Sequence, residues 1–276
     1  MADFTPRVLH TNGDRLTAYD HGAHVASWVR HGVPVVWVSE RSHYETGVAI
    51  RGGMPVCWPW FAAGPSGELS PSHGFLRTTC WRLHEQTPNS LRWRITHADL
   101  QGGEATERFP HNFECELDVR LDEELRVSLT VRNSSGSPFD FEAALHTYLH
   151  VADAEAIAIK GLSGVDYHDK VNDEDQVQDG DVRLTGETDR IYHAPGPVTV
   201  HDPVLGRDLS VHAEGTTATV IWNPWAEKAG GMSDMSDDEW RRMVCVEAAA
   251  LGPGRVRLEP GQEHTVSQRI GVAQRR

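Results

Sequence analysis

Hydrophobic and polar residues alternate with a period of two along much of the chain. Between residues 113 and 121 every odd position is apolar and every even position is charged, and the segments 125–131 and 91–96 alternate in the same way. Successive side chains of a strand point to opposite faces, so each segment predicts a strand with one buried and one solvated face, as in antiparallel sheets. Shorter β-like runs are 25–29, 35–38, 217–222 and 256–258.

Turn-forming residues separate these runs, and long helical periods are missing. The best helical candidate is 237–243, with Ser236 as its candidate N-cap. The acidic segment 172–181 is expected to be a solvated loop. Because no repeat or low-complexity linker divides the chain, we expect one domain over residues 1–276, an all-β sandwich of many mostly antiparallel strands with few short helices.

Composition and charge narrow the class of protein. The 276 residues are 39% hydrophobic, which is enough for a large core, and the net charge is -14 with neutral histidines. Nucleic acid and anionic membranes need a basic surface, so neither is an expected partner. The amino terminus lacks a secretion-signal pattern, and no apolar run approaches the roughly 18 residues of a membrane span. These features predict a soluble, cytoplasmic protein, whose four cysteines form no CxxC pair and are expected to be reduced.

The segment 139–151 carries candidate chemistry on one face of a strand. Phe141 and Leu145 fall on the core-like face, whereas His146, Tyr148 and His150 alternate onto the other. That face is either the floor of a binding cleft or an ordinary wet strand surface. On a strand His146 and His150 stand about 13 Å apart, too far to share an ion, so no metal is expected.

Glu247 is the only charged residue between Arg242 and Arg255. A lone carboxylate in an apolar strand is costly to bury, so it needs partners or a function. Desolvation raises the pKa of a carboxyl group, which improves it as a general base near neutral pH. The alternative is a carboxylate satisfied by a structural arginine.

Two further segments are irregular. Residues 51–61 combine Arg51 with two glycines, two prolines and three large aromatic residues. Residues 71–77 hold Ser72, His73 and Arg77 after a loop rich in Gly, Pro and Ser. Such loops on a rigid scaffold often bind ligands. An aromatic core crossing and an inconsequential surface pair are the alternatives.

Taken in order, these segments resemble the glucose-6-phosphate 1-epimerase branch of the aldose 1-epimerase family. The matching stretches are IRGGMPVCWPWF, PSHGFLRTTCW, LHTYLHV, GLSGVDYHDK, ETDRIY, VIWNPWAEKAGGMSDM and MVCVEAAAL. The resemblance implies a galactose-mutarotase-like β-supersandwich that binds its sugar in a cleft on a concave sheet. It also implies a monomer with no metal and no organic cofactor.

The same resemblance assigns residues to roles. It places the catalytic histidine at His146 and the catalytic glutamate at Glu247. Arg51 and Arg77 match arginines that contact substrate or phosphate, and Asp189 matches an aspartate that holds sugar hydroxyls. His73 matches a histidine that faces the sugar ring. Ser72 stands where close relatives often carry glutamine. Lys170 and Lys228 are further candidates for the phosphate that the resemblance does not decide.

The expected function is interconversion of the α and β anomers of a hexose 6-phosphate, with glucose 6-phosphate the first candidate. In this hypothesis Glu247 removes the proton of the C1 hydroxyl, and protonated His146 delivers one to the ring oxygen. Histidine suits the role because its ordinary pKa of about 6.5 lies near the working pH. The alternatives are a mutarotase for a free aldose, a non-catalytic carbohydrate-binding module and, more remotely, a carbohydrate lyase or a glycosidase, which usually pairs two carboxylates.

Overall fold

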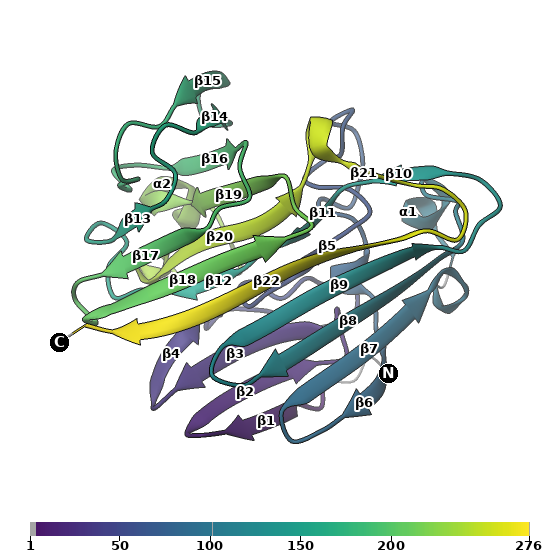
Figure 1. The fold of residues 1–276 in the computed structure, drawn as a ribbon, viewed down its shortest axis with the longest axis horizontal. Helices are drawn as coiled ribbons and strands as arrows, with labels where there is room; N and C mark the ends of the chain where they lie inside the picture. Colours follow the sequence, from purple (N-terminus) through teal and green to yellow (C-terminus); the bar gives the residue numbers. More distant parts are fainter. Residues whose placement is uncertain (1–3, 101, 276) are drawn as a thin grey trace.

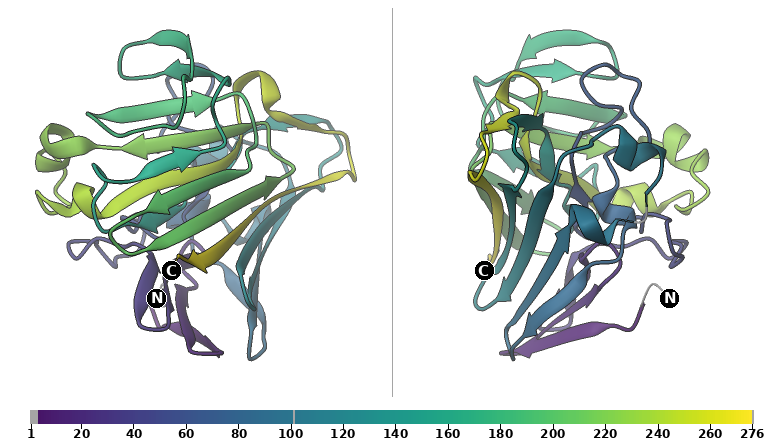
Figure 2. Two further views of the ribbon diagram at one scale, coloured as in Figure 1. Left: turned by 60° about the vertical axis from the view of Figure 1, so that its left-hand side comes forward. Right: turned by 90° about the vertical axis from the view of Figure 1, so that its right-hand side faces the viewer.

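The alternating segments form two large antiparallel sheets that pack face to face, as Figures 1 and 2 show. The computed structural model describes residues 4–100 and 102–275. Apolar side chains of both sheets fill the space between them, among them Trp28, Trp93 and Leu129, each with no exposed surface. The all-β sandwich predicted from the alternation is thereby confirmed.

The larger sheet has twelve strands among the described residues. Its main order is β1-β2-β3-β4-β12-β20-β19-β16-β14-β15, and β11 joins it by pairing with both β20 and β5. The strands are β1 (Arg7–Thr11), β2 (Asp14–Tyr19), β3 (His24–Arg30), β4 (Val33–Val36), β5 (Val56–Cys57), β11 (Ala143–Leu145), β12 (Tyr148–His150), β14 (Asp166–Asp169), β15 (Glu174–Val177), β16 (Thr188–Tyr192), β19 (Ala218–Asn223) and β20 (Met243–Ala250).

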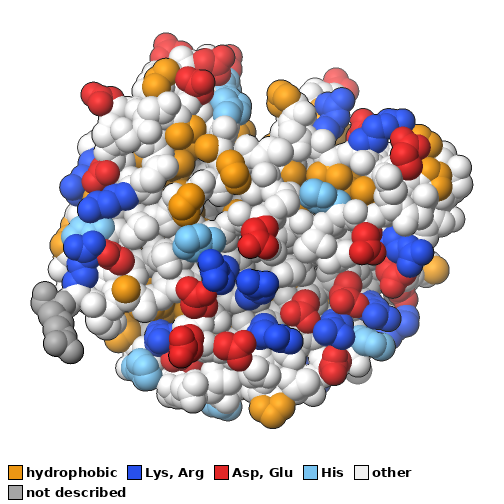
Figure 3. Space-filling view, in the orientation of Figure 1, with side chains coloured by type: hydrophobic (Ala, Val, Ile, Leu, Met, Phe, Trp, Pro, Cys, Tyr) orange, Lys and Arg blue, Asp and Glu red, His pale blue; other side chains and the backbone are white. Residues whose placement is uncertain are grey.

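The smaller sheet has eight strands in the order β13-β17-β18-β22-β9-β8-β7-β6 among the described residues. They are β6 (Arg82–Gln86), β7 (Ser90–Thr96), β8 (Phe113–Leu121), β9 (Leu125–Asn133), β13 (Ala158–Lys160), β17 (Val198–Asp202), β18 (Arg207–Glu214) and β22 (Glu263–Gln274). On its outer face charged side chains of both signs interleave, as Figure 3 shows, and the cross-strand pair Arg94–Glu116 closes to 2.7 Å.

Besides the two large sheets, the described residues form one short ladder of two strands and a few short helical segments. The ladder pairs β10 (Phe139–Phe141) with β21 (Val256–Leu258). The helices are α1 (Glu104–Glu107) and α2 (Trp225–Gly230), with 3-10 turns η1 (Leu76–Thr78), η2 (His97–Asp99), η3 (Glu239–Arg242) and η4 (Gly252–Gly254). Within the described part of the chain, no helix is long and apolar enough to cross a membrane.

Two local predictions need correction. The expected helix 237–243 is the single 3-10 turn η3, and Ser236 does not cap it with its side chain. An N-cap side chain would accept a hydrogen bond from a backbone N–H of the helix. Here the backbone N–H of Ser236 instead donates to the Glu239 carboxylate (2.7 Å). The acidic segment 172–181 is not all loop, because β15 pairs with β14 and extends the sheet at its edge. All four β15 side chains are exposed, so the segment has the solvation expected of it.

The twelve-stranded sheet is covered on both faces near β20. Val244, Val246 and Ala248 point into the core between the sheets. Met243 and Cys245 point the other way, into a cluster with Trp37, Tyr148, Ala229, Met235 and Trp240. Figure 2 shows α2 and the loops between β4 and β6 on this outer side, away from the eight-stranded sheet. Chemistry-bearing side chains on the outer face of β20 are therefore shielded from bulk water.

Candidate active site

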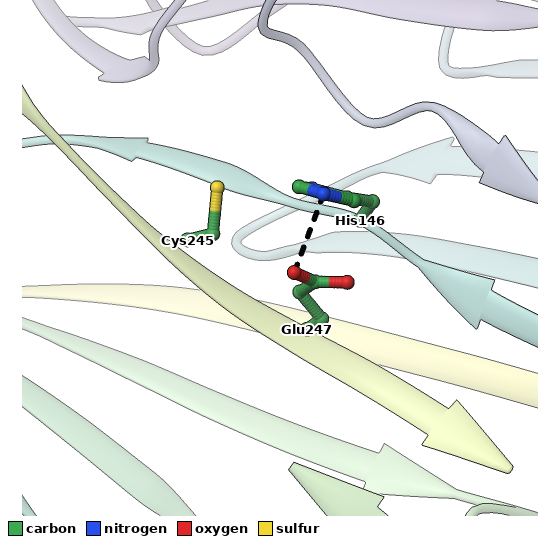
Figure 4. A group of neighbouring side chains, drawn as sticks. All are labelled: His146, Cys245 and Glu247. Carbon is green, nitrogen blue, oxygen red and sulfur yellow. Dashed lines mark ion pairs between the residues drawn. The ribbon is translucent and has the colours of Figure 1, made fainter. Parts of the chain in front are cut away.

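His146, in the connection between β11 and β12, lies opposite Glu247 on β20. β11 and β12 pair with β20 in one continuous register, with Leu145 opposite Ala248 and Tyr148 opposite Cys245. That register sets His146 against Glu247, and His146 Nε2 lies 3.4 Å from Glu247 Oε1. A dashed line marks this contact in Figure 4. The two side chains that the sequence singled out are thus brought into contact.

Burial dominates the electrostatics of this pair. The side chain of His146 is 9% exposed and that of Glu247 is 1% exposed. Burial raises the pKa of Glu247 well above its ordinary value, and Asp189 raises it further against the opposing effect of Lys170 and Arg77. Burial also lowers the pKa of His146 well below its ordinary value, with His73, Arg77 and Arg51 acting in the same direction. Both effects favour a neutral pair, with the proton on the carboxyl group.

Aromatic rings fix the plane of the His146 imidazole. The ring of Tyr148 stacks on it at 4.9 Å between centroids and 13° between planes. The ring of Trp222 meets it edge-on at 6.2 Å, and that of His73 at 5.4 Å. Neither His146 Nδ1 nor Glu247 Oε2 has a hydrogen-bond partner among the described residues. Packing therefore holds the imidazole, and the pair keeps polar atoms available to a ligand.

His73 is held by an unusual backbone turn. Its φ is 65°, and Gly74 follows at 71°. A Cβ on Gly74 would lie 1.9 Å from the Trp58 carbonyl oxygen, so only glycine fits there. The Ala62 N–H donates to His73 Nδ1 (3.3 Å), and burial lowers the pKa of His73 to about 3. The imidazole is therefore neutral and carries its proton on Nε2.

Arg51 reaches the site from the loop between β4 and β5. Its Nε donates to Asp234 Oδ2 (3.0 Å), and its Nη1 donates to the Tyr148 hydroxyl (3.1 Å). The loop that carries Asp234 is fastened by buried Glu239, whose carboxylate accepts from Ser39 Oγ (2.7 Å) and from the Glu40 N–H (2.9 Å). Arg51 is thus oriented before any ligand binds.

Arg77 and Ser72 lie together on the loop that ends in η1. Arg77 Nη2 donates to the Ser72 backbone carbonyl (2.9 Å). Arg77 Nε is buried without a hydrogen-bond partner among the described residues, so the guanidinium retains an unused donor. The Ser72 side chain is exposed. Ser72 therefore contributes to the site through its backbone, by orienting Arg77.

Asp189 pairs with Lys170 at the edge of the site. Lys170 Nζ lies 3.1 Å from Asp189 Oδ2 and 5.8 Å from the centroid of the Phe61 ring. The influence of both residues on the pKa of Glu247 places them within electrostatic reach of the pair. Lys228, the other lysine considered from the sequence, pairs instead with Glu187 (2.7 Å). The His150 backbone carbonyl accepts a hydrogen bond from Arg207 Nη2 (2.8 Å).

One group of metal-ligating residue types coincides with the pair. The ligand atoms of His146, Cys245 and Glu247 all lie within 4.8 Å of one another. Figure 4 shows the three side chains. A metal would need the thiolate and the carboxylate. Burial raises the pKa of the Cys245 thiol and that of Glu247 well above their ordinary values. These three residues therefore favour protonated groups and are a poor match for a metal.

Three contributors to the site lie beyond the sequence-based assignments. The alternation places Tyr148 on the correct face but gives it no role, the resemblance does not decide Lys170, and no pattern points to Asp234. Asp234 lies 183 residues from Arg51 in the sequence, and no local pattern joins them. The continuous register of β11 and β12 against β20 is the signal that brings Tyr148 into the site.

A separate hollow lies elsewhere on the molecule. It has a volume of about 840 Å³ on the outer face of the eight-stranded sheet and contains Arg126, Arg269 and Glu124 in its lining. It shares no lining residue with the site around His146 and Glu247. In this hollow the arginines alternate with carboxylates, whereas the site around His146 and Glu247 concentrates buried titratable groups. The chemistry therefore favours the site around His146 and Glu247 as the functional one.

Comparison with known proteins agrees with the geometry. The chain is 35% identical over 259 residues to an Escherichia coli K12 protein named as a candidate glucose-6-phosphate 1-epimerase, covering 92% of this chain and 85% of that protein. It is 33% identical over 258 residues to a protein from Cenchrus ciliaris with the same description, covering 89% and 77%. The crystal structure of YeaD, a candidate mutarotase from Salmonella typhimurium, superposes with a TM-score of 0.85 at 31% identity, covering 97% of this chain and 90% of that one.

The similar solved structures and the matching family model indicate the same kind of protein. Galactose-mutarotase-like proteins among the solved structures share the architecture at lower identity, one from Lactobacillus casei with a TM-score of 0.77. This likeness confirms the supersandwich fold expected from the sequence. The aldose 1-epimerase family model matches residues 7–271. The chain therefore belongs to the aldose 1-epimerase family.

Proposed function

We propose that this protein interconverts the α and β anomers of a hexose 6-phosphate, with glucose 6-phosphate as its first substrate. The observation that carries the proposal is the buried contact between His146 Nε2 and Glu247 Oε1 (3.4 Å), with two arginines nearby. The names of the relatives from Escherichia coli and Cenchrus ciliaris support the choice of sugar phosphate. Family membership supports the class of enzyme, an isomerase.

Anomer exchange needs one base and one acid at the same time. The Glu247 carboxylate takes the proton of the C1 hydroxyl while the His146 imidazolium donates a proton to the ring oxygen. The bond between C1 and the ring oxygen breaks, and C1 becomes an aldehyde. After rotation about C1–C2 the roles reverse and the ring closes on the other face. Each group is expected to accelerate the reaction about 10²- to 10⁴-fold.

The electrostatics of the pair suit the open-chain stage. Once the ring has opened, Glu247 holds the proton and His146 is neutral. That is also the form which burial favours, because burial raises the pKa of Glu247 and lowers that of His146. The protein therefore stabilises the stage at which the sugar is least stable.

The phosphate is assigned to the arginines. A guanidinium presents a planar fork of donors that matches a phosphate dianion. Arg51 and Arg77 both lower the pKa of His146. A dianion bound by both arginines offsets their part of the effect, so substrate binding moves the pKa of His146 upward, toward the imidazolium that ring opening requires. Asp189 and Lys170 then offer an acceptor and a donor to the sugar hydroxyls.

The test measures anomer exchange by saturation-transfer NMR. The substrates are glucose, mannose and galactose, each with and without the 6-phosphate. We expect the phosphorylated sugars to be preferred and Glu247→Gln and His146→Ala each to lose nearly all exchange. Preference for a plain sugar would replace the proposal by a free-aldose mutarotase. Absence of exchange with every sugar would favour a carbohydrate-binding module. Wild-type turnover in either variant would refute the acid/base assignment.

A further inference from the structure

The backbone departs from regular β structure at His146. In the continuous register, Thr147 lies opposite Val246, and the Val246 N–H donates to the Thr147 carbonyl (3.1 Å). The reciprocal bond is missing, because the Thr147 N–H turns back to the Leu145 carbonyl (3.0 Å). A bond between residues two apart is a γ-turn, and His146 is its central residue. This turn separates β11 from β12.

The turn leaves the Val246 carbonyl without its partner from the neighbouring strand, and Gln268 supplies a replacement. Gln268 lies on β22 in the opposite sheet, on the inward face, with Val266 and Ile270 on either side. Its Nε2 donates to the Val246 carbonyl (2.9 Å). Its Oε1 accepts a hydrogen bond from the Thr147 hydroxyl. Gln268 is 1% exposed and Thr147 is fully buried.

The residues that Gln268 joins are the sequence neighbours of the proposed acid and base. Thr147 follows His146, and Val246 precedes Glu247. A catalytic imidazole is commonly oriented by a hydrogen bond at its second nitrogen. His146 Nδ1 makes none among the described residues, so the aim of the ring depends on its backbone and on ring packing. A buried amide in an apolar core is costly unless its bonds are satisfied. One of these bonds ends at Thr147 in the turn, and the other ends at Val246, opposite the turn on β20.

We propose that Gln268 is a positioning residue that sets the geometry of His146 against Glu247 through Thr147 and Val246. The assignment of a catalytic role rests on the proposed function, whereas the control of His146 geometry does not. Loss of either hydrogen bond releases the γ-turn, and the imidazole moves relative to the carboxyl group. A shift of about 1 Å in a catalytic group lowers turnover about 100-fold.

The experiment compares Gln268→Leu, Thr147→Val and Thr147→Ser with the wild-type protein. Thr219→Val is the matched control, because Thr219 is a buried threonine of the same sheet whose hydroxyl donates to the Ala194 carbonyl (2.8 Å) and makes no bond to Gln268. The readouts are kcat and KM for glucose 6-phosphate, the pH profile of kcat, the thermal midpoint, and the NMR signals of the His146 imidazole.

We expect Gln268→Leu and Thr147→Val to lower kcat about 10- to 100-fold with little change in KM. The His146 signals and the pH profiles of these two variants should shift. Thr147→Ser keeps the hydroxyl that bonds Gln268, so its His146 signals and pH profile should match those of the wild type. Thr219→Val should change only the thermal midpoint. If Gln268→Leu does not fold, Thr147→Val decides the question alone.

The proposal is overturned if folded Thr147→Val retains the kcat and His146 signals of the wild type, or if Thr219→Val changes them equally. A wild-type protein without anomer exchange refutes the proposed function instead. In that case the NMR signals of His146 still decide whether Gln268 and Thr147 control its geometry.

Discussion

The guanidinium of Arg51 donates a hydrogen bond to the Tyr148 hydroxyl, whose ring stacks on His146. One tyrosine thus joins the arginine assigned to the phosphate and the histidine assigned to the ring oxygen. Its hydroxyl and its ring serve these two neighbours separately, so the two contributions can be separated by mutation.

Tyr148→Phe is expected to raise KM for glucose 6-phosphate about 3- to 10-fold with kcat nearly unchanged, because it removes one hydrogen bond to Arg51 and keeps the stacked ring. Steady-state anomer exchange measures both constants. Tyr192→Phe is the matched control, since the Tyr192 hydroxyl bonds Gln178 (2.7 Å) on another part of the same sheet. A fall in kcat at constant KM would instead place the hydroxyl in the chemical step.

Arg77→Ala is expected to raise KM for glucose 6-phosphate about 10- to 100-fold, the range for losing a charged hydrogen bond of about 1.5–3 kcal/mol. Arg77 Nε has no hydrogen-bond partner among the described residues, so the guanidinium keeps a donor beyond its bond to the Ser72 carbonyl. Plain glucose is the control substrate and should lose far less. Equal losses with both sugars would remove Arg77 from the phosphate site.

Acid stability should depend on His24, which lies beneath the Arg51 loop. Burial lowers the pKa of His24 to about 3, whereas the unfolded chain binds a proton near pH 6.5. The unfolded state therefore takes up more protons below pH 6.5, and the folded state loses stability as the pH falls. The effect of this residue is about 2 kcal/mol at pH 5.

Urea unfolding of wild type and His24→Gln between pH 7 and pH 5 tests this expectation. The glutamine variant should show a shallower loss of unfolding free energy with acid, whatever its stability at pH 7. Parallel curves would show that His24 does not contribute to the acid response.

Gly74→Ala is expected to destabilise the fold by about 2–3 kcal/mol, because a non-glycine residue at φ +71° is strained and its Cβ would overlap the Trp58 carbonyl. Gly67→Ala is the matched control, because its φ is +73° and an added methyl group would enter open space. Thermal unfolding should separate the two. Equal losses would assign the whole effect to backbone conformation.

The fold was predictable where one physical pattern dominates. The strand over 113–121 agrees residue for residue with β8, because a hairpin with one buried face enforces strict alternation. The helix predicted over 237–243 does not form, because Glu239, one of the acidic residues that suggested a helix start, is buried. Its carboxylate accepts a hydrogen bond from the Ser39 hydroxyl, and only a single 3-10 turn forms.

The residues of the candidate site that could be predicted are those marked by a pattern within one strand. Alternation placed His146 on the outer face, and isolation in an apolar run marked Glu247. The partners that orient the site come from distant segments: Asp234 beside Arg51, Lys170 beside Asp189, and Gln268 behind Thr147. Local patterns carry no information about such pairings, because tertiary packing alone decides them.

Arg51, one of the two arginines assigned to the phosphate, already has a carboxylate partner in Asp234. A phosphorylated sugar that binds there competes with this built-in counter-ion, so the net electrostatic gain is smaller than a bare cation would give. We therefore expect substrate and product to leave the site readily. For a catalyst that only equilibrates two forms of one molecule, modest affinity for both forms favours repeated turnover.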